Sequence, residues 1–203
     1  MKYLELSTEE LNIRCKDWAK CISLVFRPDL IIYIARAGYI FAKPMAEIFD
    51  VPLLGIGAVR SGNSIKEIVG PIFAYLPSFF RKIIAKVEIK SGVHKKKTER
   101  EVVFHQKIND INCSKYRKIL IVDDAVDTGY SMKKVAEMAK EKFNNADIRT
   151  ACFNMSCDEK DCVMKIDYIQ LQGYSVKTPF SKDSKEYTKT KKQYYKDTNN
   201  EYI

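Results

Sequence analysis

The pattern of apolar and polar positions in the first third of the chain predicts alternating helices and strands. Apolar residues at helical spacing follow Ser7 and Glu10, which have the spacing of a capping box, and indicate a leading helix. The apolar run "DLIIYIA" (29–35) predicts a buried strand, "GYIFAKPMAEIFD" (38–50) a helix, and "VPLLGIGAV" (51–59) a second strand. This order is typical of parallel strands joined by a right-handed crossover.

The second half of the chain continues the same alternation. It predicts a strand at 118–123, a helix at about 129–143, and strands near 147–154 and 166–171. We therefore expect the α/β class, with a mostly parallel twisted sheet and flanking helices. Residues 60–117 interrupt the rhythm with an apolar, basic stretch and an alternating one, so we expect an insert and a flexible arm there.

Length and composition favour one domain. The 203 residues suit a single α/β domain over residues 1–180, followed by a polar tail over 181–203 rich in Lys, Tyr and Asn. No apolar leader begins the sequence, and no apolar run reaches the roughly 18 residues of a membrane span. We expect a cytoplasmic protein without a membrane span.

The six cysteines do not form a disulfide scaffold or a zinc motif. They lie in or beside regular segments at low density, which is typical of reduced thiols. Cys157 and Cys162 flank an acidic, turn-like stretch, but no further Cys or His pair accompanies them at the spacing of a zinc site. We interpret these cysteines as structural.

The positive charge is concentrated in one segment. Between Arg81 and Lys118 lie twelve Lys or Arg residues and four Asp or Glu residues, so this segment carries +8 of the net charge of +9. Such a segment attracts anions, so nucleic acid is a possible partner. It is the less favoured one, because no aromatic-glycine RNA-binding signature accompanies the charge. An amphipathic membrane-surface helix within "PSFFRKIIAKVEIKSG" ranks below packing of that stretch in a dimer or a hood.

The stretch "ILIVDDAVDTGYSM" (119–132) carries the clearest chemistry. A buried strand runs into Asp123 and Asp124, Asp127 follows, and Gly129 opens a helical pattern. A strand, a sharp turn and a helix N-terminus would bring the carboxylates and the anion-binding N–H groups together at the carboxyl end of the strand. The alternative for the acid pair alone is plain helix-end electrostatics.

This stretch resembles the phosphoribosyl-diphosphate signature of the type I phosphoribosyltransferases. Upstream, "IYIARAGYIFAKPMAEIFDVPLLGI" is similar to the strand, diphosphate loop and helix of the same family, and the resemblance covers about residues 28–175. It implies that family's fold with a small hood from the termini, and as partners it implies phosphoribosyl diphosphate, a small acceptor and a second copy of the chain. It also implies Mg²⁺-dependent transfer to the acceptor, with release of diphosphate.

The resemblance also implies roles for individual residues. Asp123 and Asp124 would bind the ribose hydroxyls and Mg²⁺, and N–H groups after them would hold the 5′-phosphate. The substrate-binding residues implied are Ala35, Arg36, Ala37, Gly38, Asp123, Asp124, Ala125, Val126, Asp127, Thr128, Gly129, Tyr130 and Ser131.

The acceptor is less clearly defined by the sequence. Asp-Thr-Gly at 127–129 is similar to the 6-oxopurine enzymes, so Asp127 would be a general base or would orient a purine. Those enzymes carry a Lys on the next strand, which "RTACFNMSC" lacks, so Asn154 or Ser156 would replace it. Tyr174 or Phe180 would stack on the base. A non-nucleobase acceptor therefore stays open.

The basic arm supplies the remaining candidates. Lys95 and Arg100 would act catalytically by neutralising the departing diphosphate as a loop closes over the reaction, and their neighbours His94, Lys96, Lys97 and His105 would assist. The alternative for each is a solvated charged arm. A second class of function also remains, a regulatory or RNA-binding protein that senses phosphoribosyl diphosphate.

Overall fold

A computed structural model describes residues 2–60, 100–104 and 112–198, with only the backbone described at Ala35, 57–60 and 100–104. Its helices and strands are β1 (Lys2–Glu5), α1 (Thr8–Ser23), β2 (Leu30–Ala35), α2 (Gly38–Phe49), β3 (Leu53–Arg60), β4 (Arg100–Phe104), η3 (Cys113–Lys115), β5 (Lys118–Val126), α5 (Tyr130–Lys142), β6 (Asp147–Met155), η4 (Glu159–Asp161), β7 (Tyr168–Gln172), β8 (Tyr174–Lys177) and α6 (Tyr187–Thr198).

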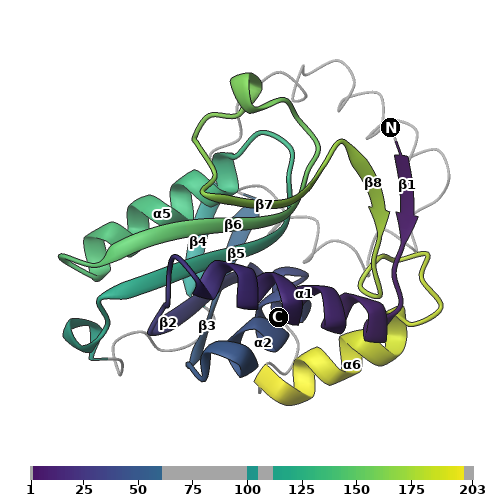
Figure 1. Cartoon of the computed structure of the whole chain (residues 1–203), viewed down its shortest axis with the longest axis horizontal. Coiled ribbons are helices and arrows are strands. Elements are labelled where there is room, and N and C mark those ends of the chain that lie inside the picture. Colours follow the sequence, from purple (N-terminus) through teal and green to yellow (C-terminus); the bar gives the residue numbers. More distant parts are fainter. Residues whose placement is uncertain (1, 61–99, 105–111, 199–203) are drawn as a thin grey trace, which may run out of the picture. The chain divides into compact units, whose positions relative to one another are not determined.

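A six-stranded sheet with the order β4-β3-β2-β5-β6-β7 forms the centre of the fold (Figure 1). Strands β3, β2, β5, β6 and β7 are parallel, with Tyr33 opposite Val122 and Asp123 opposite Cys152. The chain leaves β2 toward β3 on one side and leaves β5 toward β6 on the other. The carboxyl ends of β2 and β5 therefore form a topological switch point, where α/β sheets bind ligands. The expected α/β fold with a mostly parallel sheet is confirmed.

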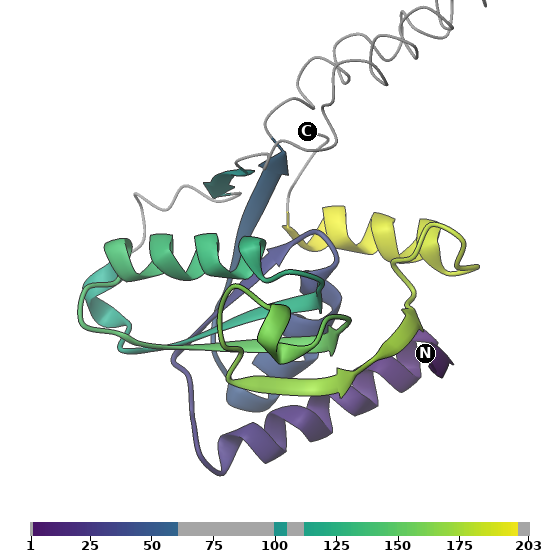
Figure 2. The same cartoon turned by 90° about the horizontal axis from the view of Figure 1, so that it is seen from above.

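Both faces of the sheet are covered, which explains the nearly continuous apolar strands. In β5, Leu120 and Val122 enter the core under α1 and α2, whereas Ile119 and Ile121 enter the core under α5. Figure 2 shows α5 on one face and α1 and α2 on the other. All four side chains are fully buried, and burial of each contributes about 1.5–3 kcal/mol.

The leading helix begins at the expected capping box. The Ser7 hydroxyl accepts a hydrogen bond from the Glu10 N–H at 3.2 Å, and the Glu10 carboxylate accepts one from the Ser7 N–H at 2.9 Å. The Ser7 hydroxyl also donates to the Glu10 carboxylate at 2.8 Å, and the two bonds that this carboxylate accepts from Ser7 lower the pKa of Glu10. The apolar positions Leu11, Trp18 and Ile22 are buried, as their helical spacing predicts, and they fix α1 on the sheet.

A second, two-stranded sheet joins opposite ends of the sequence. Strand β1 pairs in parallel with β8, with Lys2 opposite Tyr174 and Glu5 opposite Lys177. The periodicity of the sequence predicts neither strand, because both are short and their pairing is remote. Figure 1 shows this pair beside the main sheet, at the end of β7.

The polar tail expected over 181–203 needs correction, because part of it is helix α6. Tyr194 is only 1% exposed, and its ring contacts Tyr39 edge-on at 5.3 Å between centroids. Asp197 accepts hydrogen bonds of 2.6 Å from the Tyr39 hydroxyl and from the Lys43 ammonium. Tyrosine rings lie on the buried side of this helix. The lysines between them make the segment polar overall, so its composition does not indicate that the helix packs against the rest of the chain.

The chain divides into two compact units, Met1–Gly57 with Val102–Ile203, and Ala58–Glu101. Most of the second unit, and with it most of the expected insert and arm, lies outside the described residues. Within the described part of the chain, no helix combines the length and apolarity needed to cross a bilayer.

Candidate functional site

The acid pair lies at the carboxyl end of β5, against the first residue of α2. Asp123 is 7% exposed and Asp124 is half-buried. A Cβ atom on Gly38 would lie 3.1 Å from the Val122 carbonyl oxygen and 3.7 Å from the Asp123 Oδ1 atom. Gly38 thus lets the 35–38 turn approach the acids closely. The two motifs, distant in sequence, meet at the switch point of the sheet.

Burial changes the electrostatic state of Asp124. Desolvation raises the pKa of Asp124, and the negative charge of Asp127 adds to this rise, while hydrogen bonding with the Asp123 side chain and with the backbone at 124 and 125 opposes it. Asp123 Oδ1 accepts the Asp124 N–H at 2.9 Å. A cation beside the pair would therefore stabilise its charged form.

The donor set at the acid pair suits a hard cation that also contacts a ligand. Among the described residues, no group of three or more His, Cys, Asp or Glu side chains could hold a metal ion. Mg²⁺ commonly uses only one or two carboxylates, with substrate oxygens and water completing its shell. Asp123 and Asp124 fit that pattern.

The turn after β5, residues 126–129, leads directly into α5, and we call it the signature turn. Gly129 is the N-cap of α5, with φ 81° and ψ −4°. A Cβ atom there would lie 2.6 Å from the Cys162 sulfur, so a side chain would meet both strain and collision. The first turn of α5 contains no acidic residue. Its N–H groups and positive dipole end therefore favour an anion.

The segment after β6 lies on the signature turn. The Ser156 hydroxyl donates a hydrogen bond to the carboxylate of Asp127, which is exposed. The Ser156 N–H donates to the Val126 carbonyl at 3.0 Å, and the Val163 N–H donates to the Thr128 carbonyl at 3.0 Å. This segment thus holds Asp127 at the mouth of the site.

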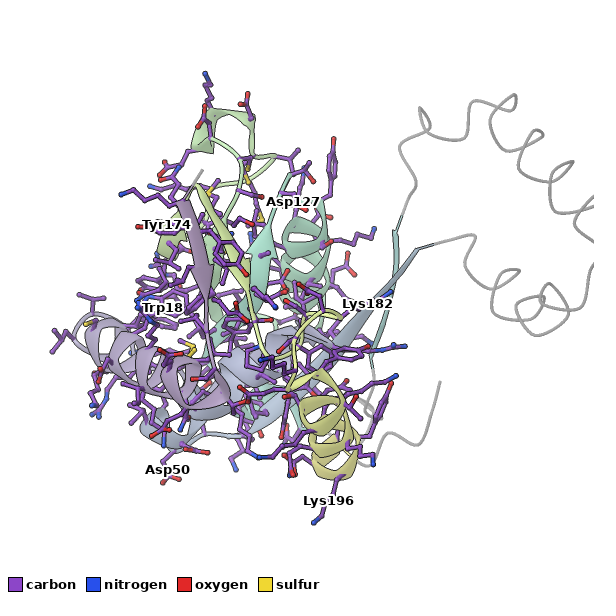
Figure 3. The ribbon with its side chains drawn as sticks, turned by 90° about the vertical axis from the view of Figure 1, so that its right-hand side faces the viewer. Trp18, Asp50, Asp127, Tyr174, Lys182 and Lys196 are labelled. Carbon is purple, nitrogen blue, oxygen red and sulfur yellow. The ribbon has the colours of Figure 1, made fainter. Side chains whose placement is uncertain are left out.

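Asn154 positions the aromatic candidate on β8. Its side-chain N–H group donates to the Tyr174 carbonyl at 3.0 Å, and Asn154 is 6% exposed. The Tyr174 ring is partly exposed and lies 5.9 Å from the Lys2 ammonium. Phe180 instead contacts Tyr194 of α6 edge-on, in the apolar core. Figure 3 shows Asp127 and Tyr174 toward the same end of the molecule.

The remaining expected site residues belong to the turn before α2, to the end of β5 and the start of α5, and to the basic arm. Arg36 is exposed in the turn between β2 and α2, and Ala37 is the N-cap of α2. Ala125 and Tyr130 are exposed, and Ser131 is half-buried in the first turn of α5. Lys95, with His94, Lys96, Lys97 and His105, lies outside the described residues, and Arg100 begins β4 with only its backbone described.

The sequence analysis missed two contacts at the site. Tyr39, directly after Gly38, is hydrogen-bonded to Asp197 of α6, and the Cys162 sulfur lies against Gly129. The spacing of Cys157 and Cys162 around an acidic turn was the available signal for the second contact. Nothing in the local sequence indicates the first.

The sequence matches the family described as phosphoribosyl transferase domain over residues 6–181. A purine phosphoribosyltransferase from Pyrococcus horikoshii is 20% identical with a TM-score of 0.57, over 91% of this chain and 97% of that one. A xanthine-guanine-hypoxanthine phosphoribosyltransferase from Helicobacter pylori is 15% identical with a TM-score of 0.58, over 94% and 97%. A hypothetical protein from Neisseria gonorrhoeae with bound ppGpp is 13% identical with a TM-score of 0.59, over 97% of both chains. No curated protein matches the chain.

Proposed function

Because the chain belongs to the phosphoribosyl transferase family, and is therefore a phosphoribosyltransferase, we propose that it uses phosphoribosyl diphosphate as donor and a purine-type nucleobase as acceptor. The observation that carries this proposal is the meeting of three parts at one switch point: the Gly38 turn, the acid pair, and the N-terminus of α5. Each part suits one portion of an anionic sugar.

The donor would bind across these three parts. Asp123 and Asp124 would accept hydrogen bonds from the ribose hydroxyls, since carboxylates accept and hydroxyls donate. N–H groups from Asp127 to Ser131 would receive the 5′-phosphate at the start of α5. Arg36, exposed beside Gly38, would contact the diphosphate. The close approach of Gly38 to Asp123 supports a donor whose ribose and diphosphate are held together.

Mg²⁺ fits the acid pair, with Asp123 and Asp124 as the residues that would hold it. Burial and the neighbouring Asp127 raise the pKa of Asp124, which is the condition that a nearby cation relieves. When bound, the ion supplies positive charge to the diphosphate oxygens.

The reaction would break the bond from ribose C1 to a diphosphate oxygen and form a bond from C1 to an acceptor nitrogen. The sugar passes through a state with oxocarbenium character, so the protein must hold donor and acceptor in line and exclude water. Asp127 would accept the proton of that nitrogen or orient it, and Ser156 would position Asp127 through its hydroxyl. Tyr174, placed by Asn154, would stack on the base.

A screen of acceptors tests the proposal. The protein would be mixed with phosphoribosyl diphosphate, Mg²⁺ and one candidate at a time: hypoxanthine, guanine, xanthine, adenine, uracil and orotate. Release of diphosphate and formation of the nucleotide would be measured. We expect turnover with at least one purine and none with the pyrimidines. Turnover with pyrimidines alone would refute the purine assignment, and release of diphosphate without a new nucleotide would refute nucleobase transfer.

A further inference from the structure

The segment between β6 and β7 is anchored to the signature turn at both of its ends. Near its start, the Ser156 N–H donates to the Val126 carbonyl at 3.0 Å. Near its end, the Val163 N–H donates to the Thr128 carbonyl at 3.0 Å. Residues 156–163 therefore form a closed loop whose two ends lie on the turn that carries Asp127. Any covalent change inside this loop would act on the turn.

The loop brings two thiols together. The short helix η4 reverses the chain, with hydrogen bonds from the Asp161 N–H to the Asp158 carbonyl at 2.9 Å and from the Cys162 N–H to the Glu159 carbonyl at 3.3 Å. As a result, the side chains of Cys157 and Cys162 lie near enough to each other to interact. Both are free, and we call them the paired thiols.

The paired thiols also contact the signature turn directly. The Cys157 sulfur lies 3.9 Å from the Val126 carbonyl oxygen. The Cys162 sulfur lies 2.6 Å from the position that a Cβ atom on Gly129 would occupy. The absence of a side chain at Gly129 thus provides the space for the second sulfur. The two sulfurs lie between the loop and the turn.

The other described cysteines differ in exposure or in neighbours. Cys15 and Cys152 are buried, and burial raises the pKa of both thiols, that of Cys15 to about 12. Burial raises the pKa of Cys157 as well, so access to solvent, and not acidity, distinguishes the pair from these two. Cys21 is exposed on α1 and Cys113 is partly exposed in η3, and both lie far along the chain from the loop. Cys157 and Cys162 are each partly exposed, so an oxidant in solution can reach them. They combine access with a neighbouring thiol, which is the arrangement that oxidises to a disulfide.

We propose that Cys157 and Cys162 form a reversible intramolecular disulfide, with a hydroperoxide as the oxidant, and that this disulfide changes the signature turn. One thiolate attacks a peroxide oxygen, breaks the O–O bond and becomes a sulfenic acid, and the other part of the peroxide leaves as water or an alcohol. The second thiol then displaces the sulfenic oxygen as water and forms the S–S bond. The two thiols lose two electrons and two protons, and the peroxide gains them.

The effect on the turn follows from the contacts of the two sulfurs. An S–S bond holds two sulfur atoms closer together than any non-bonded contact between thiols, so at least one sulfur must move relative to Val126 or Gly129. The N–H groups at the start of α5 should then exchange with solvent at a different rate. This inference rests on the geometry of the loop and does not require the proposed function.

Peptide mapping of the full chain tests the disulfide. Wild type would be treated with hydrogen peroxide, its remaining thiols alkylated, and its peptides identified by mass before and after dithiothreitol. We expect a linked Cys157–Cys162 pair that dithiothreitol restores to two alkylated thiols. Cys21→Ser is the matched control and should behave as wild type, whereas Cys162→Ser should form no such link. Full alkylation of both thiols after peroxide treatment would refute the disulfide.

Amide hydrogen exchange tests the effect on the turn. The peptide that covers 126–131 would be compared in the reduced and oxidised protein, with Cys157→Ala treated identically as a control for other oxidation. We expect a change in wild type that dithiothreitol reverses, and none in Cys157→Ala. Unchanged exchange in fully linked wild type would refute the action on the turn. Neither measurement depends on transferase activity, so a failed acceptor screen would leave both results interpretable.

Discussion

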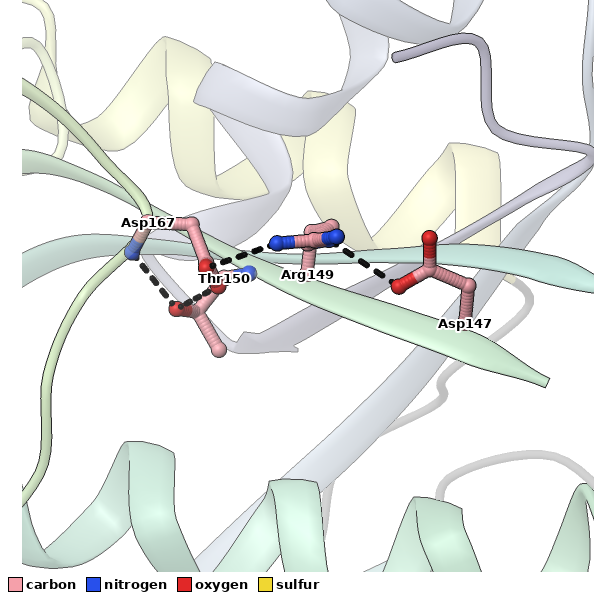
Figure 4. A network of polar contacts seen from close by, with 4 residues as sticks. All are labelled: Asp147, Arg149, Thr150 and Asp167. Carbon is pink, nitrogen blue, oxygen red and sulfur yellow. Dashed lines mark hydrogen bonds and ion pairs between the residues drawn. The ribbon is translucent and has the colours of Figure 1, made fainter. Parts of the chain in front are cut away.

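The two ends of the central sheet use aspartate in opposite ways. At the amino ends of the strands, Asp29 accepts the N–H groups of Arg117 and Lys118 at 2.8 and 3.0 Å. Asp167 accepts the N–H and the hydroxyl of Thr150 at 2.8 and 2.9 Å, and it lies 3.5 Å from Arg149 (Figure 4). These carboxylates receive donors from neighbouring strands, so Asp29 ties the start of β2 to the start of β5, and Asp167 ties the start of β7 to β6.

At the carboxyl ends, the carboxylates lie close to one another. Asp123 accepts the N–H of Asp124, and Asp127 accepts the hydroxyl of Ser156. The charge of Asp127 adds to the burial that raises the pKa of Asp124. Clustered carboxylates destabilise the isolated protein, whereas a ligand with hydroxyls or a cation would stabilise them. The direction of the strands, more than the residue type, therefore separates the structural aspartates from those that we propose to bind the ligand.

The largest effect should come from removing both charges at the carboxyl end. In Asp123→Asn with Asp124→Asn, the ribose loses two charged acceptors, each worth about 1.5–3 kcal/mol. We expect the affinity for phosphoribosyl diphosphate to fall about 10²–10⁴-fold by calorimetry, with a cooperative melting curve retained. Equal affinity in a folded double mutant would contradict the ribose assignment.

The same comparison gives a prediction for pH. Because folding raises the pKa of Asp124, its charged form costs stability above that pKa, and the cost disappears as the pH falls below the ordinary Asp value of about 4. Asp124→Asn should therefore melt at or above the wild-type temperature at pH 7. Its advantage should shrink toward acid pH. A lower melting temperature for the mutant at pH 7 would contradict the destabilising role of this charge.

The sequence predicts the central strands well, and it predicts that the acid pair follows the apolar run of β5, because both signals are local. Strand β5 runs beyond its apolar residues to Val126, since Ala125 and Val126 lie opposite Asn154 and Met155 of β6. No local pattern contains that partner. The pairing of β1 with β8 and the burial of Tyr194 depend likewise on remote contacts. The closeness of Gly38 to Asp123 follows from the fold. The sequence indicates it only through the family resemblance, which assigns both residues to one substrate.

The next effect concerns turnover and should separate Asp127 from the acid pair. In Asp127→Asn, the acids and the N–H groups of the donor site remain, so we expect most of the donor affinity to remain too. The single-turnover rate with the best acceptor should fall about 10²-fold, the usual scale for a positioned acid or base. Titration and rapid-quench measurements on both proteins would check this. Equal losses of affinity and rate would instead make Asp127 a donor-binding residue.

At the amino ends, substitution should change stability and leave binding intact. Asp167→Asn removes a charged acceptor from the Thr150 N–H and hydroxyl, so we expect unfolding to become easier by about 1–3 kcal/mol in urea titrations. Asp147→Asn is the matched control, because its bond to Arg149 is exposed and worth about 0–1 kcal/mol. Donor affinity should stay at the wild-type value in both. A large loss of affinity in Asp167→Asn would erase the distinction between the two ends.

The smallest effect should come from Ser156→Ala, which removes the hydroxyl on Asp127 but keeps the N–H bond to Val126. One hydrogen bond contributes about 0.5–1.5 kcal/mol, so we expect the single-turnover rate to fall about 2–10-fold, with donor affinity and melting temperature unchanged. A double-mutant cycle tests whether this loss passes through Asp127. If Ser156 acts only by holding that carboxylate, adding Ser156→Ala to Asp127→Asn should cost little further rate, because the group it positions is already altered. Additive losses would mean that Ser156 contacts the acceptor itself, and that the position of the missing lysine is occupied by a hydroxyl.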